Sequence, residues 1–249
     1  MEQMHSLTVV NWNVEWVTPR SRRFRSVRDL IVGHNPDVVC ITEGEQSVMP
    51  DDGHTIESDP DYGYSTAPPH RRKVLLWSRR RWTLVDTLGS SGLPGGRVVV
   101  GTTETPIGAV RFVGVCIPWR DAHVRTGRAD RSPWEDHLLY LSSLDEVLSG
   151  LTDSMPTVIV GDFNQTVPKT WAPQRVFDAL MHTFRHHDVI TAGALPGTTR
   201  PAIDHLAVTH DLTVASIRGW SNIAENGERL SDHDGVVAEL RLTEDRQTQ

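Results

Sequence analysis

Short apolar runs rich in valine, leucine and isoleucine recur along the chain, and polar or glycine-containing turns separate them. Runs of this length predict β-strands, because β-branched side chains pack well on a pleated surface. The runs between residues 74 and 117 follow one another after short turns, a spacing typical of antiparallel meanders. The predicted strands cover residues 7–12, 38–42, 74–77, 82–88, 98–103, 110–117, 158–160, 203–208, 212–219 and 236–242.

Three other segments carry apolar residues at helical spacing. The strongest signal begins at Ser132, which forms a capping-box pattern with Glu135 and has Pro133 at the first helical position. The remaining two predicted helices lie within residues 21–33 and 176–184. The apolar stripe of the strongest helix consists of Leu138, Leu141, Leu144, Leu148 and Leu151.

So many strands beside three helices are too strand-rich for a Rossmann sheet. The pattern predicts an α/β (α+β) fold, a four-layer sandwich in which two packed, mostly antiparallel β-sheets are flanked by helices. No linker rich in proline, glycine or serine divides the chain, so residues 1–249 are predicted to form a single domain, with about 244–249 as a disordered tail.

Composition narrows the class of protein. Hydrophobic residues make up 38% and charged residues 23%, and the net charge of −7 argues against coating nucleic acid by bulk charge. Cys40 and Cys116 lie in apolar runs, which predicts buried free thiols and a reducing compartment. The first residues show no signal-peptide pattern and no run reaches about 18 apolar residues, so we expect a cytoplasmic protein without a membrane span.

Acidic and amide side chains gather where predicted strands end or begin. One such residue is unremarkable, because turns favour Asp and Asn, but five such positions along one chain form a pattern. Carboxylates gathered at one edge of a sheet repel one another, and a divalent cation such as Mg²⁺ relieves that repulsion. The residues concerned are Asn13 and Glu15, Glu43, Asp162 and Asn164, Asp204, and Asp232 with His233.

In order and spacing, these segments resemble the endonuclease/exonuclease/phosphatase superfamily, which has the deoxyribonuclease-I-like fold. The resemblance spans residues 11 to 233, nearly the whole chain. The matching segments are residues 11–15 (NWNVE), 41–43 (ITE), 161–164 (GDFN), 203–205 (IDH) and 231–233 (SDH).

The resemblance implies an enzyme that hydrolyses phosphoesters with Mg²⁺ or Mn²⁺. It implies that Glu43 is the principal metal ligand and that Asn13 lies beside it and helps to hold the metal or the phosphate. Glu15 matches a position where an acidic residue can assist metal binding, and Asp232 is implied as an outer ligand.

The resemblance also assigns the chemistry of the attack. Asp162 is expected to orient and deprotonate the attacking water, and Asn164 to hold a phosphate oxygen. Asp204 is expected to hydrogen-bond His233, which fixes the tautomer and favours an imidazolium that faces the phosphate. The sequence does not decide whether His233 acts as a base or stabilises the phosphate electrostatically.

The chain departs from the family pattern in two places. Cys116 stands where many relatives carry histidine or tyrosine, and Glu45 stands where nuclease relatives often carry a basic residue. Arg120 or His123 is a candidate to reach the phosphate instead, the alternative being ordinary loop residues. Trp16 and Trp119, also on loops near the site, are candidates to stack on a base or sugar, with burial by packing as the alternative.

Three functions follow as hypotheses. The first is a nuclease or phosphodiesterase that cleaves DNA or RNA by in-line attack of an activated water. The alternative is a phosphatase or phosphodiesterase acting on a small-molecule or lipid phosphate, and the third is a catalytically inactive binding module. The sequence leaves open the choice between DNA and RNA, endo- and exonucleolytic attack, and the oligomeric state.

Overall fold

The computed structural model describes residues 5–64, 68–88, 92–94, 96–151 and 154–243. Two six-stranded sheets pack face to face. The first has the order β11-β12-β1-β2-β4-β3 and the second the order β5-β6-β7-β8-β10-β9. The strands of the first are β1 (Leu7–Asn13), β2 (Val38–Gly44), β3 (His54–Glu57), β4 (Arg72–Ser78), β11 (Leu212–Trp220) and β12 (Gly235–Leu242). Those of the second are β5 (Trp82–Asp86), β6 (Val98–Thr105), β7 (Gly108–Cys116), β8 (Thr157–Asp162), β9 (Asp188–Val189) and β10 (Asp204–Val208).

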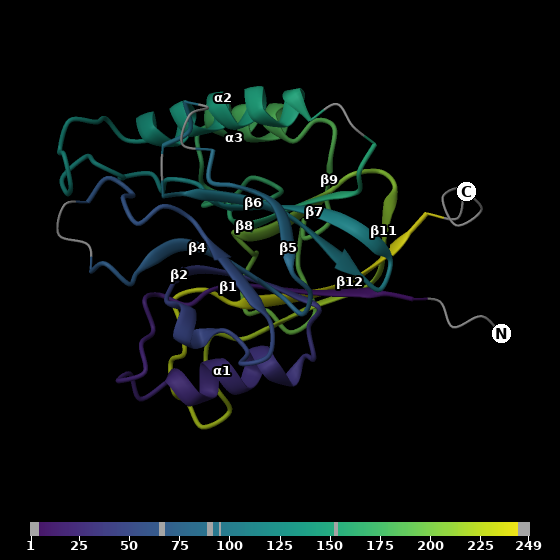
Figure 1. Cartoon of the computed structure of the whole chain (residues 1–249). Helices are drawn as coiled ribbons and strands as arrows, with labels where there is room; N and C mark the ends of the chain where they lie inside the picture. The colour runs from purple at the N-terminus through teal and green to yellow at the C-terminus, as the bar shows by residue number, and fades with distance from the viewer. Residues whose placement is uncertain (1–4, 65–67, 89–91, 95, 152–153, 244–249) are drawn as a thin grey trace.

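Helices cover the outer face of each sheet. Helix α1 (Phe24–Gly33) lies below the first sheet, and α2 (Glu135–Gly150) and α3 (Gln174–Thr183) lie above the second (Figure 1). A short 3₁₀ helix, Gln46–Val48, follows β2. The predicted four-layer sandwich of two mostly antiparallel sheets flanked by helices is therefore confirmed.

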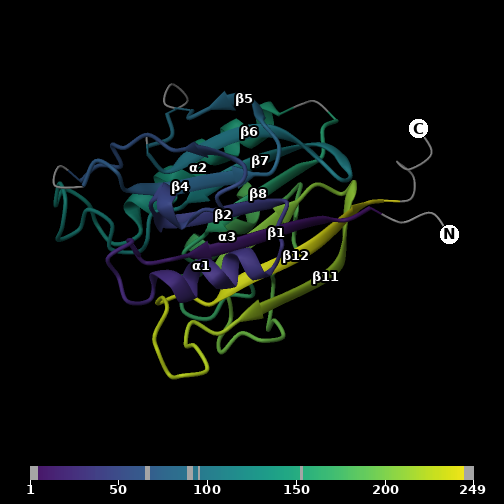
Figure 2. The same cartoon turned by 60° about the horizontal axis from the view of Figure 1, so that its bottom comes forward.

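Each sheet contains one parallel pair, and each of these pairs requires a crossover helix. Strands β1 and β2 run parallel with α1 between them in sequence, and β7 and β8 run parallel with α2 between them. Parallel neighbours need such a long connection, whereas an antiparallel pair such as β6 and β7 can be joined by a short turn. Figure 2 shows α1 lying across the strands that it connects.

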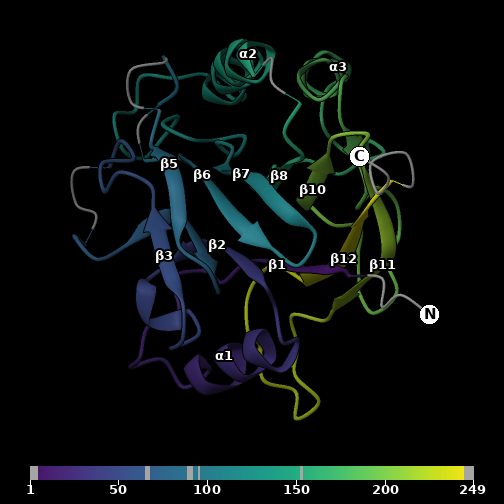
Figure 3. The ribbon, with the colours of Figure 1, turned by 45° about the vertical axis from the view of Figure 1, so that its right-hand side comes forward.

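The C-terminal strand pairs with the N-terminal strand, which makes the first sheet continuous. β12 is antiparallel to β1, with Leu240 opposite Leu7 and Val236 opposite Asn11. Figure 3 shows β12 lying between β1 and β11 in this sheet. Strands from the two ends of the chain are thus direct neighbours inside this sheet.

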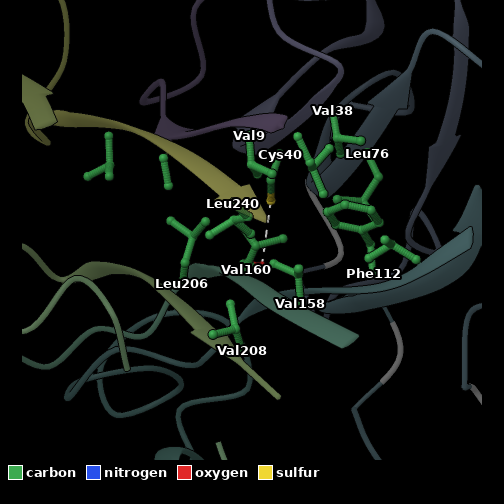
Figure 4. Close-up of a cluster of buried hydrophobic side chains, with 14 of the residues drawn as sticks. Val9, Val38, Cys40, Leu76, Phe112, Val158, Val160, Leu206, Val208 and Leu240 are labelled. Atoms are coloured by element: carbon green, nitrogen blue, oxygen red, sulfur yellow. Dashed lines mark hydrogen bonds between the residues drawn. The ribbon is translucent and has the colours of Figure 1, made fainter. Parts of the chain in front are cut away.

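Strand periodicity sends alternate side chains into two different cores. Val9 and Cys40 face the core between the sheets, whereas Val10, Val39 and Ile41 face α1. The inter-sheet core is closely packed in Figure 4, where the Cys40 thiol donates a weak hydrogen bond of 3.6 Å to the Val160 carbonyl oxygen. A third core packs α2 and α3 against the second sheet.

The sequence pattern missed β3 and β9 and placed the start of α2 too early. Both strands are short, and β3 lacks the valine-rich run that marks the others. The helix begins at Glu135, because Trp134 adopts a left-handed conformation with φ of 72°. The Glu135 carboxylate accepts a hydrogen bond from the Ser132 amide (2.9 Å), but the Ser132 side chain caps nothing, so only half of the predicted capping box forms.

Of two further predictions, one is confirmed and the other stays a prediction. Both cysteines are buried free thiols, as predicted. The predicted disordered tail at residues 244–249 lies outside the described residues. Among the described helices, none has the length and apolar character needed to span a membrane.

Candidate active site

Strand direction brings the predicted polar residues to one edge of the two sheets. β1, β2 and β8 end at this edge, with Asn13, Glu43 and Asp162 in or next to their last positions. β10 is antiparallel to β8 and begins there, so Asp204 stands directly opposite Asp162. β12 is antiparallel to β1, and His233 lies just before it. The topology alone therefore converts five distant segments into one site.

A cavity of about 210 Å³ opens at this edge, which we call the strand-end cavity. Its lining comes from both sheets, so it lies where the two layers meet. The lining residues are Asn13, Glu43, Lys73, Arg97, Cys116, Trp119, Asp162, Asn164, Asp232 and His233.

Asp162 is held rigidly at the centre of the site. Its Oδ2 accepts hydrogen bonds from the side-chain amides of Asn13 and Asn164, each 3.0 Å long. Its Oδ1 accepts the backbone amide of Asn164 at 2.8 Å. Burial raises the pKa of Asp162 to about 7, even though the nearby His233 opposes the shift. The result is a fixed carboxylate that can exchange a proton near neutral pH.

The local backbone around Asp162 depends on glycine. Gly161 has a φ of 144°, and a Cβ added there would overlap the Val115 carbonyl oxygen of the adjacent β7. Asn164 has a φ of 54° and Glu43 a φ of 53°, so two polar residues of the site occupy the left-handed region. Non-glycine residues held in that region cluster at functional sites, because the surrounding structure must compensate their strain.

His233 and Asp204 form a buried pair beside Asp162. The His233 Nδ1 and the Asp204 Oδ2 lie 2.5 Å apart, and their side chains are 10% and 2% exposed. Burial alone would lower the pKa of His233, but Asp204 and Asp162 outweigh burial and raise that pKa to about 10. At neutral pH the ring is therefore an imidazolium, and its Nε2 remains available to an anionic ligand.

The backbone of His233 is fixed by the first sheet. The Ser231 hydroxyl accepts a hydrogen bond from the His233 amide (3.1 Å) and donates one to the Asn13 carbonyl oxygen (2.6 Å). The Trp12 indole donates to the His233 carbonyl oxygen at 2.8 Å. These three bonds tie the loop before β12 to the end of β1, so the imidazole stays in register with Asn13.

Glu43 is paired with a lysine that sequence reasoning did not assign to the site. Its Oε1 lies 2.5 Å from the Lys73 Nζ, and the lysine side chain is 9% exposed. The ammonium rests 5.0 Å from the Trp16 ring centroid and 5.5 Å from that of Tyr62. Lys73 is one of only two lysines in the chain. This rarity was the one feature of the sequence that could have drawn attention to Lys73 as a site residue.

The donor chemistry of the strand-end cavity fits a hard divalent cation. Glu43, Asn13 and Asp232 line the same cavity and carry side-chain oxygen atoms, which Mg²⁺ and Mn²⁺ prefer as ligands. The Asn13 Oδ1 accepts the Glu15 amide at 3.0 Å, and the Glu43 Oε1 contacts the Lys73 ammonium. A second group, Asp162, Asp204 and His233, offers ligand atoms within 4.8 Å of one another. In that second group the His233 ring is protonated and offers no lone pair to a metal, so the oxygen atoms of the first group are the better match.

Glu15 is not brought to the cavity. Its carboxylate bonds Arg23 and Arg229, each at 2.9 Å. Although partial burial raises its pKa, hydrogen bonds from the two arginines lower it overall. Glu15 thus lies in an ion-pair cluster between the start of α1 and the loop before β12.

Of the four predicted loop residues, only Trp119 lines the strand-end cavity. Trp119 lines the strand-end cavity and is 47% exposed, whereas Arg120 points to solvent beside Asp121 (3.6 Å). His123 lies in a separate cavity of about 620 Å³, which we call the loop cavity. Trp16 is packed on Tyr62 with ring centroids 5.7 Å apart. The lining of the loop cavity includes Tyr62, Arg97, His123, Arg128, Arg131 and Asp136.

His123 does not line the strand-end cavity and is packed against its neighbours in the loop cavity. Its ring stacks on Tyr64 at 4.5 Å, and its Nδ1 accepts the Arg128 amide at 3.2 Å. Burial and the Arg128 charge lower its pKa, the reverse of the shift at His233. His123 is therefore a neutral packed histidine in this structure.

Cys116 reaches the strand-end cavity but offers little chemistry there. Burial raises the pKa of its thiol to about 12, so the side chain is neutral at physiological pH. A neutral thiol is a weak hydrogen-bond donor. The departure noted in the sequence thus leaves this position without a strong polar group.

The chain is similar in sequence to one protein family and in fold to several solved structures. A model described as the Endonuclease/Exonuclease/phosphatase family matches residues 10–233. No curated protein sequence matches the chain. Among similar solved structures, an AP endonuclease from Archaeoglobus fulgidus has a TM-score of 0.68 at 16% identity, covering 93% of this chain and 98% of that one.

Two further structures agree in fold. The 3' phosphatase NExo from Neisseria, bound to a product DNA hairpin, has a TM-score of 0.67 at 19% identity and covers 93% of this chain and 98% of that one. An endonuclease/exonuclease/phosphatase from Beutenbergia cavernae DSM 12333 has a TM-score of 0.65 at 18% identity, covering 96% of this chain and 72% of that one. At these identities the likeness shows a shared fold.

Proposed function

The chain belongs to the endonuclease/exonuclease/phosphatase family, whose enzymes hydrolyse phosphoesters, and on this premise we propose that it is a phosphodiesterase that cleaves DNA or RNA. One observation carries the proposal: Asp162, immobilised by Asn13 and Asn164, shares a cavity with Glu43 and with His233. This arrangement supplies a base, an acidic ligand and a cation around one point, as in-line phosphoryl transfer requires.

We assign Mg²⁺ or Mn²⁺ as the cofactor, held by Glu43 and Asn13 with Asp232 as an outer ligand. All three line the strand-end cavity and carry side-chain oxygen atoms, and Asp232 is half exposed beside the His233 Nε2 at 3.8 Å. Such an ion supplies Lewis-acid stabilisation of the phosphate charge when bound. Lys73 neutralises Glu43 in the absence of another cation.

Asp162 orients the attacking water and accepts its proton. Its two oxygens are fixed by three hydrogen bonds, so a water bonded to this carboxylate has a defined direction of approach. A carboxylate whose pKa is raised to about 7 is also a stronger base than an exposed aspartate.

His233 stabilises negative charge on the phosphate. Asp204 holds Nδ1, which directs the remaining N–H of the imidazolium toward the cavity. The Asn164 amide already donates to Asp162 and to the Ile117 carbonyl oxygen at 2.8 Å. In this geometry Asn164 fixes Asp162 first, and a contact with a phosphate oxygen requires one of those bonds to open.

A nucleic acid substrate is favoured by the rim of the cavity. Trp119 is half exposed at the edge, and Arg120 lies next to it in solvent. An exposed aromatic ring beside a cation suits a base and its backbone phosphate. The neighbours include a Neisseria phosphatase bound to DNA, which supports the same substrate class.

A small phosphoester is the second candidate, and one cavity favours it. A hollow of about 550 Å³ adjoins His233 and Asp204 and is lined partly by Trp171, Ala202 and Ile203. An apolar wall next to the reacting centre suits a compact, uncharged leaving group.

Hydrolysis of a substrate panel tests the proposal. The panel contains labelled single- and double-stranded DNA and RNA oligonucleotides, bis-(p-nitrophenyl) phosphate and p-nitrophenyl phosphate, each with Mg²⁺, Mn²⁺ or EDTA. We expect metal-dependent cleavage of an oligonucleotide by the wild type and none by Asp162→Asn. Turnover of small esters alone would select the second candidate, and absence of all turnover with metal bound would overturn both.

We also propose a cytoplasmic location, on the ground that Cys40 and Cys116 are both buried as free thiols. Unpaired cysteines persist in a reducing compartment. Fractionation of expressing cells with a compartment marker tests this assignment.

A further inference from the structure

Arg97 is a buried arginine that faces the strand-end cavity without an acidic partner among the described residues. Its side chain is only 3% exposed, yet it lines the cavity together with Asp162 and His233. Its guanidinium makes one hydrogen bond in the described part of the chain, a long one of 3.3 Å from Nη1 to the Cys116 carbonyl oxygen. Sequence reasoning did not single out this residue.

The backbone of Arg97 is anchored, so its side chain is not on a free loop. The Arg97 carbonyl oxygen accepts the Cys116 amide at 3.0 Å and the Tyr140 hydroxyl at 2.9 Å. Tyr140 belongs to α2 and is fully buried in the core between this helix and the second sheet. These bonds fix Arg97 between the start of β6 and the end of β7, at the wall of the cavity.

The neighbouring cations show what is unusual about Arg97. Lys73 has Glu43 at 2.5 Å, and Arg128 and Arg131 have Asp136 at 3.5 and 2.6 Å. Arginine stays protonated in proteins, so Arg97 cannot escape burial by losing its charge. A buried charge without a partner is strongly unfavourable, which points to a partner that arrives from outside the chain.

We propose, as a deepening of the function proposed above, that Arg97 is a catalytic residue that donates to a non-bridging oxygen of the phosphate being cleaved. The planar guanidinium fork matches phosphate oxygens in pairs. Cys116 offers only a neutral thiol on the same wall, so Arg97 is the strong donor there. The ligand class is a phosphodiester or phosphomonoester, recognised through its equatorial oxygens.

Matched arginine variants test this assignment. Arg97→Met removes the charge from the strand-end cavity, Arg97→Lys keeps a charge without the fork, and Arg128→Gln removes a charge from the loop cavity. Two quantities are measured for each: kcat and KM on the substrate cleaved in the panel, and affinity of the Mg²⁺-loaded protein for inorganic phosphate by calorimetry. Mn²⁺ affinity is measured in parallel as a check on the metal site.

We expect Arg97→Met to lower kcat/KM by about 100-fold, as loss of one preorganised donor does. Phosphate affinity should fall at least about tenfold, since charge-assisted bonds to phosphate are strong. Arg97→Lys should lie between, and Arg128→Gln should match the wild type, with Mn²⁺ affinity unchanged throughout.

Unchanged turnover and phosphate affinity in Arg97→Met would overturn the assignment, as would an equal loss in Arg128→Gln. If Arg97→Met does not fold, Arg97→Lys decides through the same two measurements. The phosphate titration needs no turnover, so it separates failure of this assignment from failure of the proposed hydrolase function.

Discussion

The strand-end cavity and the loop cavity adjoin each other, share Arg97, and hold their charges in opposite ways. In the loop cavity, Arg128 and Arg131 both pair with Asp136, and both arginines are partly exposed. In the strand-end cavity, Asp162 and His233 are nearly inaccessible, as is Asp204, which bonds His233. Ion pairs near solvent contribute little to stability, whereas buried charges must be compensated by a specific structure.

His233 in the strand-end cavity and His123 in the loop cavity also differ in their electrostatic surroundings. His233 and His123 are both buried, with exposures of 9% and 3%. The carboxylates around His233 raise its pKa to about 10, while burial and Arg128 lower the pKa of His123. Burial of a histidine therefore says little about its role, and the charge of its neighbours decides the protonation state.

The largest difference in rate should come from changing one carboxylate in each cavity. Asp162→Asn removes the base and should lower kcat by about 10²–10⁴-fold. Asp136→Asn, in the loop cavity, should leave kcat within about twofold, because Asp136 pairs with Arg128, Arg131 and His123 and does not line the strand-end cavity. Steady-state kinetics on the cleaved substrate, with circular dichroism to confirm folding, measures both. Similar losses in the two variants would remove the functional distinction between the cavities.

A histidine pair gives the next largest effect. His233→Ala should lower kcat by about 10²–10³-fold, since it removes a cation that faces the phosphate. His123→Ala should keep kcat and lose thermal stability, because it leaves a gap beside Tyr64. Rate and melting temperature are measured on the same preparations. A large rate loss in His123→Ala would bring the loop cavity into the reaction.

Much of the strand-end cavity and of the two-sheet fold could be predicted from the sequence. The positions of Asn13, Glu43, Asp162, Asp204 and His233 were predictable, because each adjoins a valine-rich strand and strand order brings such ends together. The two-sheet sandwich was predictable for the same reason. Local pattern and global topology agree for these segments, as they do in well-specified folds.

Side-chain direction in loops was not predictable. Glu15 lies two residues after Asn13, and an extended strand would have placed both on one side. The strand ends at Asn13, however, and Glu15 has a φ of 49°, which turns its carboxylate toward Arg23 and Arg229. Arg97 and Lys73 carry no motif at all, and only the packing of β4, β6 and β7 brings them to the cavity.

Glu43 and Glu15 should differ in their effect on metal affinity. Glu43→Gln should weaken Mn²⁺ binding by at least about tenfold, since even residues one layer outside a metal typically matter by about 10–100-fold. Glu15→Gln should leave Mn²⁺ affinity unchanged and lower stability by at most about 1 kcal/mol, the range for partly exposed ion pairs. Calorimetric titration with Mn²⁺ and denaturant unfolding measure the two effects. Equal loss of Mn²⁺ affinity in Glu15→Gln would return that residue to the metal site.

The pH profile tests the electrostatics of the strand-end cavity most finely. Asp162 must be deprotonated to act as a base, and burial raises its pKa to about 7, so kcat/KM should rise with pH up to about 7. His233 must stay protonated, and its pKa of about 10 keeps the ring cationic until the solution approaches that pH. Activity should therefore form a plateau between these values and fall on both sides, by about tenfold per pH unit.

Asp204→Asn should move both limbs of that profile to lower pH. Its carboxylate helps to raise the pKa of His233, and its charge also raises the pKa of Asp162, so removing it lowers both pKa values. The expected displacement is smaller than the rate losses above, because the imidazole and Asp162 both remain in place. Asp136→Asn, in the loop cavity, serves as the control and should leave both limbs where they are. An alkaline limb that stays fixed in Asp204→Asn would show that His233 is not held as an imidazolium by its buried partner.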